Sequence, residues 1–341
     1  MAKRRLTQQQ RTRIDRRQAS RGRETDAQDP AEISGEGLGP EATGLVICHY
    51  GQQLEIESTA IDSEGQIFRC YQRTNLPPLA TGDRVVWQAD SDSTGVIVAL
   101  QERQSLMSRP NQQANLRPVA ANVTVVAVTI APLPQAFANL IDRYLVMIHS
   151  LGLRALLILN KTDLLDAERD AALETMLKNY VGIGYPVLRV SSRGGDGIDT
   201  LREVLRPETV VFVGQSGVGK SSLINALRGE QNSPSSADVG DLSSARDKGT
   251  HTTTAARLYH MPGSGDLIDS PGIREFGLWH MDADTVFDGF VEFAPYKGMC
   301  RFRDCKHQQE PGCALKEALA KGEISEARLN SYFFLLSTLD D

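Results

Sequence analysis

The stretch "TVVFVGQSGVGKSSLINAL" (residues 209–227) decides the fold class of this chain. An apolar, β-branched run predicts a buried strand, a glycine-rich turn follows it, and a helical pattern opens at Lys220. The turn matches G-x-x-x-x-G-K-[ST] at every fixed position. Its glycines let successive backbone N–H groups face a phosphate, and the helix N-terminus adds positive potential. The stretch therefore predicts a nucleotide phosphate site; the alternative is a glycine-rich turn with a chance Lys-Ser.

Two residues of this loop have distinct expected roles. Lys220 is expected to reach the β- and γ-phosphates, and Ser221 to ligate Mg²⁺. A second strand end, "DLIDSPG" (266–272), is expected to bring Asp269 to the Mg²⁺ shell through a water and the Gly272 N–H to the γ-phosphate. The residues of the predicted phosphate loop are Gly214, Gln215, Ser216, Gly217, Val218, Gly219, Lys220, Ser221 and Ser222.

Between these two motifs, "GTHTTTAARLY" (249–259) fits a switch segment. Such a segment needs a Thr whose hydroxyl and carbonyl engage Mg²⁺ and the γ-phosphate, so that the loop is ordered only with triphosphate. Thr252, Thr253 and Thr254 are all candidates, and Thr253 is preferred. A β-rich threonine run without this role is the alternative.

A guanine-recognition loop is predicted in "ALLILNKTDLLD" (155–166), where an apolar run ends on polar residues. The Asp163 carboxylate accepts two hydrogen bonds, and guanine offers N1–H and the 2-amino group. Adenine would leave that carboxylate underpaired, at a cost of about 1–3 kcal/mol or more. Asn160 is expected on the N7/O6 side, the Lys161 stem along the purine face, and the backbone of "VSS" (190–192) at guanine O6. The predicted guanine site comprises Asn160, Lys161, Thr162, Asp163, Ser191 and Ser192.

The guanine-recognition loop precedes the phosphate loop, which reverses the order of a Ras-like GTPase. All five expected motifs are present, in the order 4-5-1-2-3. If the two ends of an ancestral sheet lie close together, joining them and cutting elsewhere preserves every strand-end loop. Apolar strands alternate with amphipathic helices from about residue 119 to 285, which favours a parallel sheet covered on both faces. The sequence thus predicts a circularly permuted P-loop GTPase domain.

The other parts of the chain differ in composition. Short β-rich runs separated by turn signals predict a small antiparallel barrel before the GTPase domain, for which an OB-fold is the preferred form and an SH3-like barrel the alternative. Near the C-terminus, Leu329, Tyr332, Phe333 and Leu336 recur with helical spacing. The expected domains are a disordered basic arm and linker (1–42), an OB-fold (43–105), a linker (106–118), the permuted GTPase domain (119–285) and a zinc-binding domain with C-terminal helices (286–341).

Charge is concentrated at the N-terminus. The chain of 341 residues has a net charge of −6, yet residues 3–23 are rich in Lys and Arg, with Asp15 as their acidic exception. This arm is expected to bind a polyanion such as nucleic acid by releasing counterions; a solvated tail is the alternative. The first residues lack the apolar core of a secretory signal, and no apolar run is long enough for a membrane span. A cytoplasmic protein without membrane contact is expected.

Three of the five cysteines crowd beside a histidine. Cys300-x4-Cys305-x-His307-x5-Cys313 offers three thiolates and one imidazole, the soft ligand set that a closed structural Zn²⁺ site prefers. A redox pair or idle surface thiols are the alternative. Arg301, Phe302 and their basic neighbours form either an RNA-contacting face or a solvated rim. Cys48 and Cys70 are expected to be core residues.

These motifs together resemble the ribosome small-subunit-dependent GTPase A family of circularly permuted bacterial GTPases. The resemblance covers residues 40–335 and is carried by "TGDRVVW", "NKTDLL", "GQSGVGKSSLINAL", "HTTTAARLY", "DSPGIREFGL" and "CRFRDCKHQQEPGC". It implies an OB-fold, a permuted GTPase domain and a zinc-binding domain with one structural Zn²⁺, with Mg²⁺ accompanying GTP. It further implies late maturation of the 30S ribosomal subunit, contact with 16S rRNA, and hydrolysis of GTP to GDP stimulated by that particle. A monomer is expected.

Ile273 follows the D-x-x-G glycine, where Ras-like enzymes carry a water-positioning Gln. Ile273 can neither donate nor accept, so another group must orient the attacking water. His251, within the switch segment, is the expected catalytic residue, as the resemblance also suggests; an exposed histidine without this role is the alternative. Two other functional classes are alternatives to a ribosome-associated GTPase. They are a GTP-regulated RNA-binding switch with negligible turnover and a nucleotide-dependent metabolic enzyme, for which no second substrate site is visible.

Overall fold

The structure is a computed structural model that describes residues 38–50, 53–110, 115–228, 256–263, 265–269 and 281–339. Residues Pro40–Asp341 form one compact unit. The basic arm, the switch residues around His251 and Thr253, and Gly272 with Ile273 lie outside the described residues. Within the described ranges, no helix is long and apolar enough to cross a membrane.

The GTPase domain is built on a largely parallel sheet. The strands, in spatial order, are β10 (Val187–Arg189), β9 (Arg154–Leu159), β8 (Val125–Ile130), β11 (Thr209–Val213), β13 (Asp266–Asp269) and β12 (Arg257–His260). Only β12 runs antiparallel to its neighbour in this set. Strands β8 and β11 are almost continuously buried, as expected for strands covered on both faces. The predicted α/β domain is confirmed.

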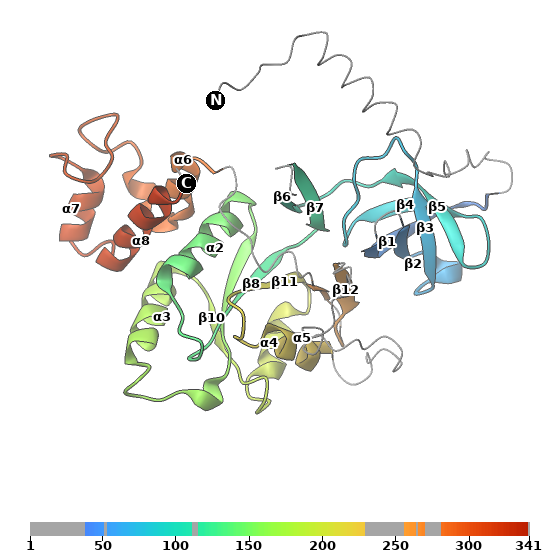
Figure 1. Cartoon of the computed structure of the whole chain (residues 1–341), viewed down its shortest axis with the longest axis horizontal. Helices are drawn as coiled ribbons and strands as arrows, with labels where there is room; N and C mark the ends of the chain where they lie inside the picture. Colours follow the sequence, from blue (N-terminus) through green and yellow to red (C-terminus); the bar gives the residue numbers. More distant parts are fainter. Residues whose placement is uncertain are drawn as a thin grey trace, which may run out of the picture. The chain divides into compact units, whose positions relative to one another are not determined.

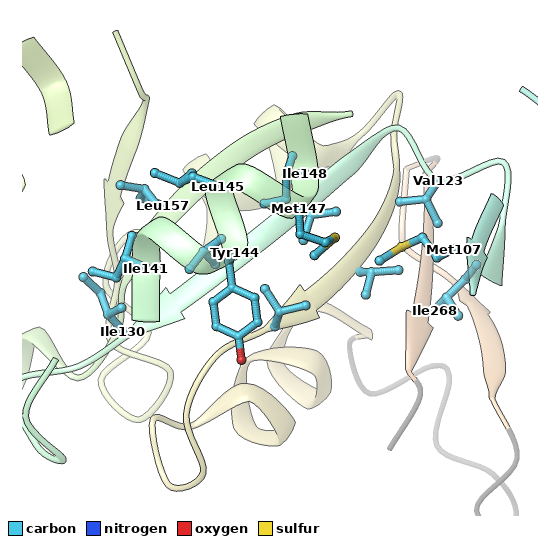
Figure 2. Close-up of a cluster of buried hydrophobic side chains, with 14 of the residues drawn as sticks. Met107, Val123, Ile130, Ile141, Tyr144, Leu145, Met147, Ile148, Leu157 and Ile268 are labelled. Atoms are coloured by element: carbon cyan, nitrogen blue, oxygen red, sulfur yellow. The ribbon is translucent and has the colours of Figure 1, made fainter. Parts of the chain in front are cut away.

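Helices cover both faces of this sheet (Figure 1). Helices α2 (Ala138–Ser150) and α3 (Ala171–Ile183) pack on one face, against Val126 and Val128 of β8. Figure 2 shows Ile130 of β8 and Leu157 of β9 beside α2. Helices α4 (Ile198–Leu205) and α5 (Lys220–Arg228) pack on the other face. Because side chains alternate along a strand, neighbouring residues of β8 serve two separate hydrophobic clusters.

Strand order explains how the reversed motif order is compatible with one site. Strand β11, which leads into the phosphate loop, pairs in parallel with β8 on one side and with β13 on the other. Strand β9, which leads into the guanine-recognition loop, pairs with β8. In an open parallel sheet, ligands bind beyond the carboxyl ends of the strands. The permuted chain therefore delivers its strand-end loops to one edge of the sheet.

A closed five-stranded barrel precedes the GTPase domain. Its strands are β1 (Glu41–Tyr50), β2 (Gln53–Ser58), β3 (Ile67–Gln72), β4 (Arg84–Ala89) and β5 (Thr94–Leu100), with a 3₁₀ turn η1 (Ile61–Ser63). They follow the order β1-β2-β3-β5-β4, and β4 closes the barrel by pairing with β1. Leu54, Phe68 and Trp87 lie in its core. The barrel is OB-like, so the expected OB-fold is confirmed over the SH3-like alternative.

The segment expected as a linker, residues 106–118, forms most of a hairpin of β6 (Leu106–Pro110) and β7 (Leu116–Ala121). Met107 of β6 and Val123, which lies shortly after β7, are buried in the same cluster as Ile268 of β13 (Figure 2). The barrel and the GTPase sheet are also joined directly, because β1 pairs with β12 at Cys48 and Arg257. The hairpin does not contradict the predicted role of residues 106–118 as the connection between barrel and GTPase domain. The limits of this linker remain a prediction.

The C-terminal module consists of α6 (Ala283–Gly289), η5 (Val291–Tyr296), α7 (Ala314–Ala320) and α8 (Glu326–Ser337). Phe287, Phe290, Phe293 and Tyr332 form its aromatic core. The predicted helix around Leu329 is confirmed as α8, whose N-terminus is capped by the Ser325 hydroxyl.

A buried polar cluster joins this module to α2. Arg328 of α8 donates to Asp142 of α2, and it also donates from Nε to Glu292 at 2.5 Å. The Tyr180 hydroxyl donates to the same Asp142 carboxylate at 2.5 Å. Burial raises the pKa of Asp142, although Arg328 counteracts this effect. Arg328 and Tyr180 therefore offset the desolvation cost of the Asp142 carboxylate at this interface.

His260 of β12 forms a second polar joint, between the GTPase sheet and the barrel. Its Nδ1 lies 2.6 Å from Asp266 and its Nε2 lies 2.5 Å from Glu57 of β2. Two carboxylate acceptors require both ring nitrogens to carry protons, and the hydrogen bonds to Asp266 and Glu57 raise the pKa of His260 to about 10. The imidazolium is thus the form that holds this joint near neutral pH.

The raised pKa of His260 predicts the direction of a pH effect on stability. The stabilisation is complete below the ordinary pKa of 6.5, declines as the unfolded state loses its proton, and is lost as the pH rises through about 10. Its size is of the order of 1 kcal/mol or less because the side chain is half-exposed. His260→Gln is expected to flatten this part of the curve of melting temperature against pH. Parallel curves for variant and wild type between pH 6 and 10 would contradict the assignment.

Candidate functional site

The phosphate loop, residues 214–222, joins β11 to α5 in the predicted strand–loop–helix arrangement. Gly214, Gly217 and Gly219 have φ of 135°, 84° and 93°, in the region that L side chains avoid. The Lys220 ammonium donates to the carbonyls of Gly214 and Gln215, at 2.7 Å each. The helix N-terminus and the lysine are therefore placed together at the end of β11, as anion binding requires.

Close backbone approach explains why two of these positions are glycine. A Cβ on Gly214 would lie 2.2 Å from the carbonyl oxygen of Thr129 in β8. A Cβ on Gly219 would lie 2.4 Å from Nδ2 of Asn160. Any side chain at Gly219 would push the phosphate loop away from the guanine-recognition loop, residues 160–163.

Asn160 directly joins the two loops that are separated in the sequence. It is fully buried, and its Nδ2 donates to the carbonyl of Val218 in the phosphate loop at 2.9 Å. Its Oδ1 accepts from the backbone N–H of Ser192, in the next strand-end loop, at 3.1 Å. One amide side chain thus connects three loops from three strands.

The side chain of Lys161 reaches across to the phosphate loop. Its backbone is left-handed, with φ of 62° and ψ of 41°, and its ammonium donates to the carbonyls of Gly217 at 2.6 Å and Leu133 at 2.9 Å. The Leu133 carbonyl belongs to the loop between β8 and α2, which sequence reasoning missed. Pro134 of that loop lies within 3.6 Å of a Cβ placed on Gly217. Backbone acceptors leave no side-chain pattern in the sequence, so no motif could have revealed this contact.

The carboxylate of Asp163 is exposed, while one of its oxygens is already oriented. The Ser191 hydroxyl donates to Asp163 Oδ1 at 2.6 Å and itself accepts from the Gly194 N–H at 2.9 Å. Ser191 is fully buried, so this hydroxyl is a fixed donor. Thr162 follows in the 3₁₀ turn η2 (Thr162–Leu164), and its N–H donates to the Val190 carbonyl at 3.2 Å. The sequence-predicted guanine residues are therefore brought together.

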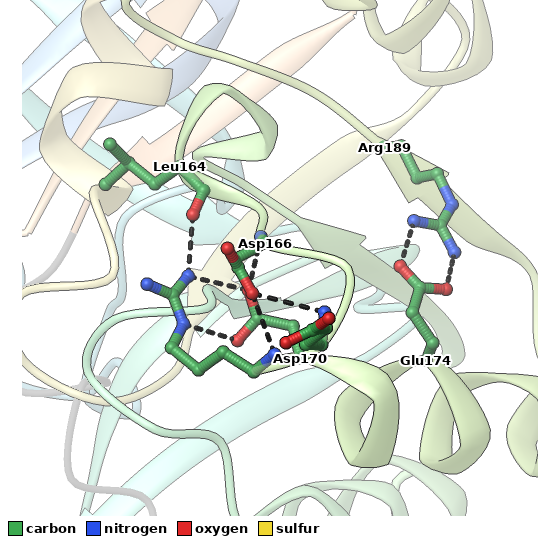
Figure 3. A network of polar contacts seen from close by, with 7 residues as sticks. Leu164, Asp166, Asp170, Glu174 and Arg189 are labelled. Atoms are coloured by element: carbon green, nitrogen blue, oxygen red, sulfur yellow. Dashed lines mark hydrogen bonds and ion pairs between the residues drawn. The ribbon is translucent and has the colours of Figure 1, made fainter.

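A charged network fixes the chain after this loop (Figure 3). Arg169 donates to the carbonyl of Leu164 at 2.7 Å and to both oxygens of Asp170. Asp170 also accepts from the Asp166 N–H at 2.9 Å. The bidentate pair of Arg189 and Glu174 ties α3 to β10 nearby. These contacts restrict the segment that carries Asp163.

The predicted Mg²⁺ side of the site is described only in part. Asp269 is the last residue of β13, the strand that pairs with β11. Ser221 lies in the first turn of α5, after Lys220. The structure thus places Asp269 at the end of β13 and Ser221 at the start of the helix that follows the neighbouring strand β11. Thr253, Gly272 and His251 lie outside the described residues.

The Cys/His cluster in the C-terminal module is compact. The ligand atoms of Cys300, Cys305, His307 and Cys313 all lie within 4.8 Å of one another. His307 Nδ1 lies 3.5 Å from Cys300 Sγ and 3.4 Å from Cys313 Sγ. A tetrahedral Zn²⁺ with ordinary bond lengths would separate sulfur and nitrogen ligands by about 3.5 Å. Burial lowers the pKa of His307, which favours the neutral ring that a metal needs. This donor set fits a metal ion.

A phosphate loop joined through Asn160 to an N-K-x-D loop, in permuted chain order, defines a circularly permuted P-loop GTPase. The family model of the RsgA GTPase matches residues 100–279. The chain belongs to the RsgA GTPase family, and it hydrolyses GTP to GDP and phosphate.

Relatives and solved structures agree with this placement. The chain is 51% identical to the small ribosomal subunit biogenesis GTPase RsgA of Pseudomonas putida, over 99% of this chain and 98% of that protein. It resembles the crystal structure of YjeQ from Thermotoga maritima with a TM-score of 0.71 and 28% identity, covering 88% of this chain and 99% of the other. It also resembles YloQ, described as a circularly permuted GTPase, with a TM-score of 0.66 and 26% identity, covering 89% and 96%.

Proposed function

We propose that this GTPase acts in late maturation of the 30S ribosomal subunit and that it contacts 16S rRNA. The observation that supports its GTPase site most is the hydrogen bond from Asn160 to Val218, which holds the N-K-x-D loop against the phosphate loop. The role at the ribosome is drawn from the names of relatives that match the chain along its whole length. A cytoplasmic, monomeric protein fits this proposal.

The proposed residue roles follow the chemistry of the site. Asp163 accepts from guanine N1–H and the 2-amino group, Ser191 orients that carboxylate, and Lys161 lies along the base. Lys220 binds the β- and γ-phosphates, while Ser221 and Asp269 hold Mg²⁺. When bound, Mg²⁺ neutralises charge that develops between the β- and γ-phosphates. Outside the described residues, Thr253 and Gly272 are proposed to contact Mg²⁺ and the γ-phosphate, respectively.

We also propose one structural Zn²⁺ on Cys300, Cys305, His307 and Cys313. The mutual distances of these four groups support the proposal. The proposed domain limits are a basic arm to residue 42, a barrel over 43–105, a linker over 106–118, a GTPase domain over 119–285 and a zinc domain from 286. The basic arm is proposed to contact RNA on the strength of its charge.

Phosphate release measured against increasing purified 30S and 50S subunits tests the proposed role at the ribosome. Turnover is expected to rise with 30S and to stay near its basal rate with 50S. Low turnover at every 30S concentration, together with GTP-dependent binding to the particle, would instead favour an RNA-binding switch without significant hydrolysis. Equal stimulation by both subunits would contradict a small-subunit role.

His251→Ala is expected to lose the 30S-stimulated turnover, by about 100-fold or more, and to keep its affinity for GTP. The expected reason is that a group orienting the attacking water contributes typically 10²–10⁴-fold to a rate. His149→Ala, on α2, is the matched control because this histidine lies in the last turn of that helix rather than in a nucleotide motif. Unchanged stimulated turnover in His251→Ala would refute the role.

A further inference from the structure

The motif "TGDRVVW" contributes to the family resemblance, yet the nucleotide site does not use it. Residues 81–83 form the turn that enters β4 of the barrel, and Thr81 and Asp83 are both buried. This TGD turn, Thr81–Asp83, faces the GTPase domain.

The TGD turn contacts both of the last two strands of the GTPase sheet. The Thr81 hydroxyl donates at 3.0 Å to the carbonyl of Ala256, which directly precedes β12. Gly82 has a φ of 92°, and a Cβ placed there would lie 3.1 Å from Cδ1 of Ile268 in β13. Ile268 directly precedes Asp269. Figure 2 shows the Ile268 side chain beside Met107 of β6 and Val123, which lies shortly after β7.

The turn itself is rigidly held. The Asp83 carboxylate accepts from the Ala80 N–H at 2.7 Å and from two nitrogens of Arg103 at 2.7 Å each. The Gly82 N–H donates to Val46 of β1 at 2.8 Å, and Asn122 Nδ2 donates to the Gly82 carbonyl at 2.8 Å. A turn that is fixed both from the barrel and from Asn122, directly after β7, can hold the strands that it touches.

Arg257 provides a second contact between the barrel and the same strand pair. It is the pairing partner of Asp269 in the antiparallel ladder of β12 and β13. Its guanidinium lies 3.3 Å from the Glu55 carboxylate of β2 and donates to the Tyr50 hydroxyl at 3.1 Å. The barrel therefore contacts β12 immediately before and at the residue that opposes Asp269.

We propose that Thr81 is a positioning residue for the Mg²⁺-dependent step of nucleotide binding, because the TGD turn sets the place of Asp269 through β12 and β13. The inference rests on the proposed role of Asp269 at Mg²⁺. A carboxylate that reaches a metal through a water must be held within about 0.5 Å of its working geometry. Coupling between two binding sites is reciprocal. Binding of Mg²⁺ and nucleotide is therefore expected to change the binding free energy of any partner that displaces the barrel.

The test measures the Mg²⁺ concentration at half-maximal binding of a fluorescent, non-hydrolysable GTP analogue by the full chain. Thr81→Val removes the hydroxyl and preserves shape, and it is expected to raise this midpoint by about 3- to 10-fold, which corresponds to the loss of one hydrogen bond. Thr81→Ser retains a hydroxyl and is expected to restore the wild-type midpoint. Thr59→Val is the matched control, since among the described residues the Thr59 hydroxyl donates within the barrel, to Thr43.

Two further measurements distinguish a positioning role of Thr81 from a merely structural one. A merely structural role for Thr81 would lower the melting temperature and the Mg²⁺-free affinity for GDP but leave the Mg²⁺ midpoint unchanged, which would overturn the inference. Asp269→Asn is expected to raise the midpoint; if it does not, the proposed Mg²⁺ role fails and the inference fails with it. If Thr81→Val does not fold, Tyr50→Phe removes the acceptor for Arg257 and is expected to raise the midpoint about twofold, and no rise would overturn the inference.

Discussion

Asp163→Asn is expected to lower the affinity for GTP by about 100-fold or more, because two charge-assisted hydrogen bonds to guanine are lost. The amide in Asp163→Asn has one acceptor oxygen, and its NH₂ group faces a donor of guanine, which cannot accept a hydrogen bond. Xanthine carries a carbonyl in place of the 2-amino group, so the same amide can pair with it. The variant is therefore expected to bind xanthosine triphosphate better than the wild type does.

Nucleotide affinities measured by competition check this prediction. Asp199→Asn is the matched control because Asp199 is an exposed carboxylate on α4, paired only with Arg202 in the described structure. The control is expected to bind GTP as the wild type does. An Asp163→Asn protein that still prefers GTP strongly over xanthosine triphosphate and ATP would show that the base is bound elsewhere.

Cys313→Ala is expected to abolish zinc binding and to unfold the C-terminal module over residues 283–337. Structural Zn²⁺ contributes about 10–16 kcal/mol of apparent binding free energy in zinc-finger peptides. This exceeds the folding free energy that the hydrophobic core of so small a module supplies by itself. Cys313 is buried and directly precedes α7, and His307 lies against the aromatic core, with ring centroids 5.7 Å from Phe287. Loss of the metal would therefore release both a helix and part of that core.

Metal analysis of the purified protein and limited proteolysis check this second prediction. One equivalent of zinc is expected in the wild type and none in the variant, and cleavage is expected to concentrate in the C-terminal module. Cys70→Ala is the control, since Cys70 is a buried thiol of the barrel core and no neighbour of the cluster. Prolonged chelation should reproduce the variant's behaviour. A Cys313→Ala protein with full zinc content would contradict the assigned ligands.

Much of the site could be predicted from the sequence because its chemistry depends on particular side chains at fixed spacings. The glycines of the phosphate loop, Lys220, and the Asn160–Asp163 loop carry their functions in residue type, and the structure places them together. The alternation of strand and helix predicted the layered domain for a similar reason. The period of apolar residues reports which face of each element is covered.

Other features had no such pattern. The Leu133 carbonyl that holds Lys161 is a backbone group, so its position depends on the path of a loop and on no residue type. The sequence left the OB-fold and the SH3-like barrel as alternatives. A β-rich run predicts that a strand exists but not which strands it pairs with. The order β1-β2-β3-β5-β4 decided it. The hairpin of β6 and β7 was also missed, since its polar sequence resembles a plain connection.

The sequence by itself determined that this protein has a permuted guanine nucleotide site and a four-residue soft ligand set, because each depends on local chemistry that every copy of the chain carries. Only the tertiary structure decided how the parts are joined: Thr81 to Ala256, Glu57 to His260, and Asp142 to Arg328. These pairs are far apart in the chain. Their contact results from strand pairing and packing summed over whole domains, which no short stretch of sequence specifies.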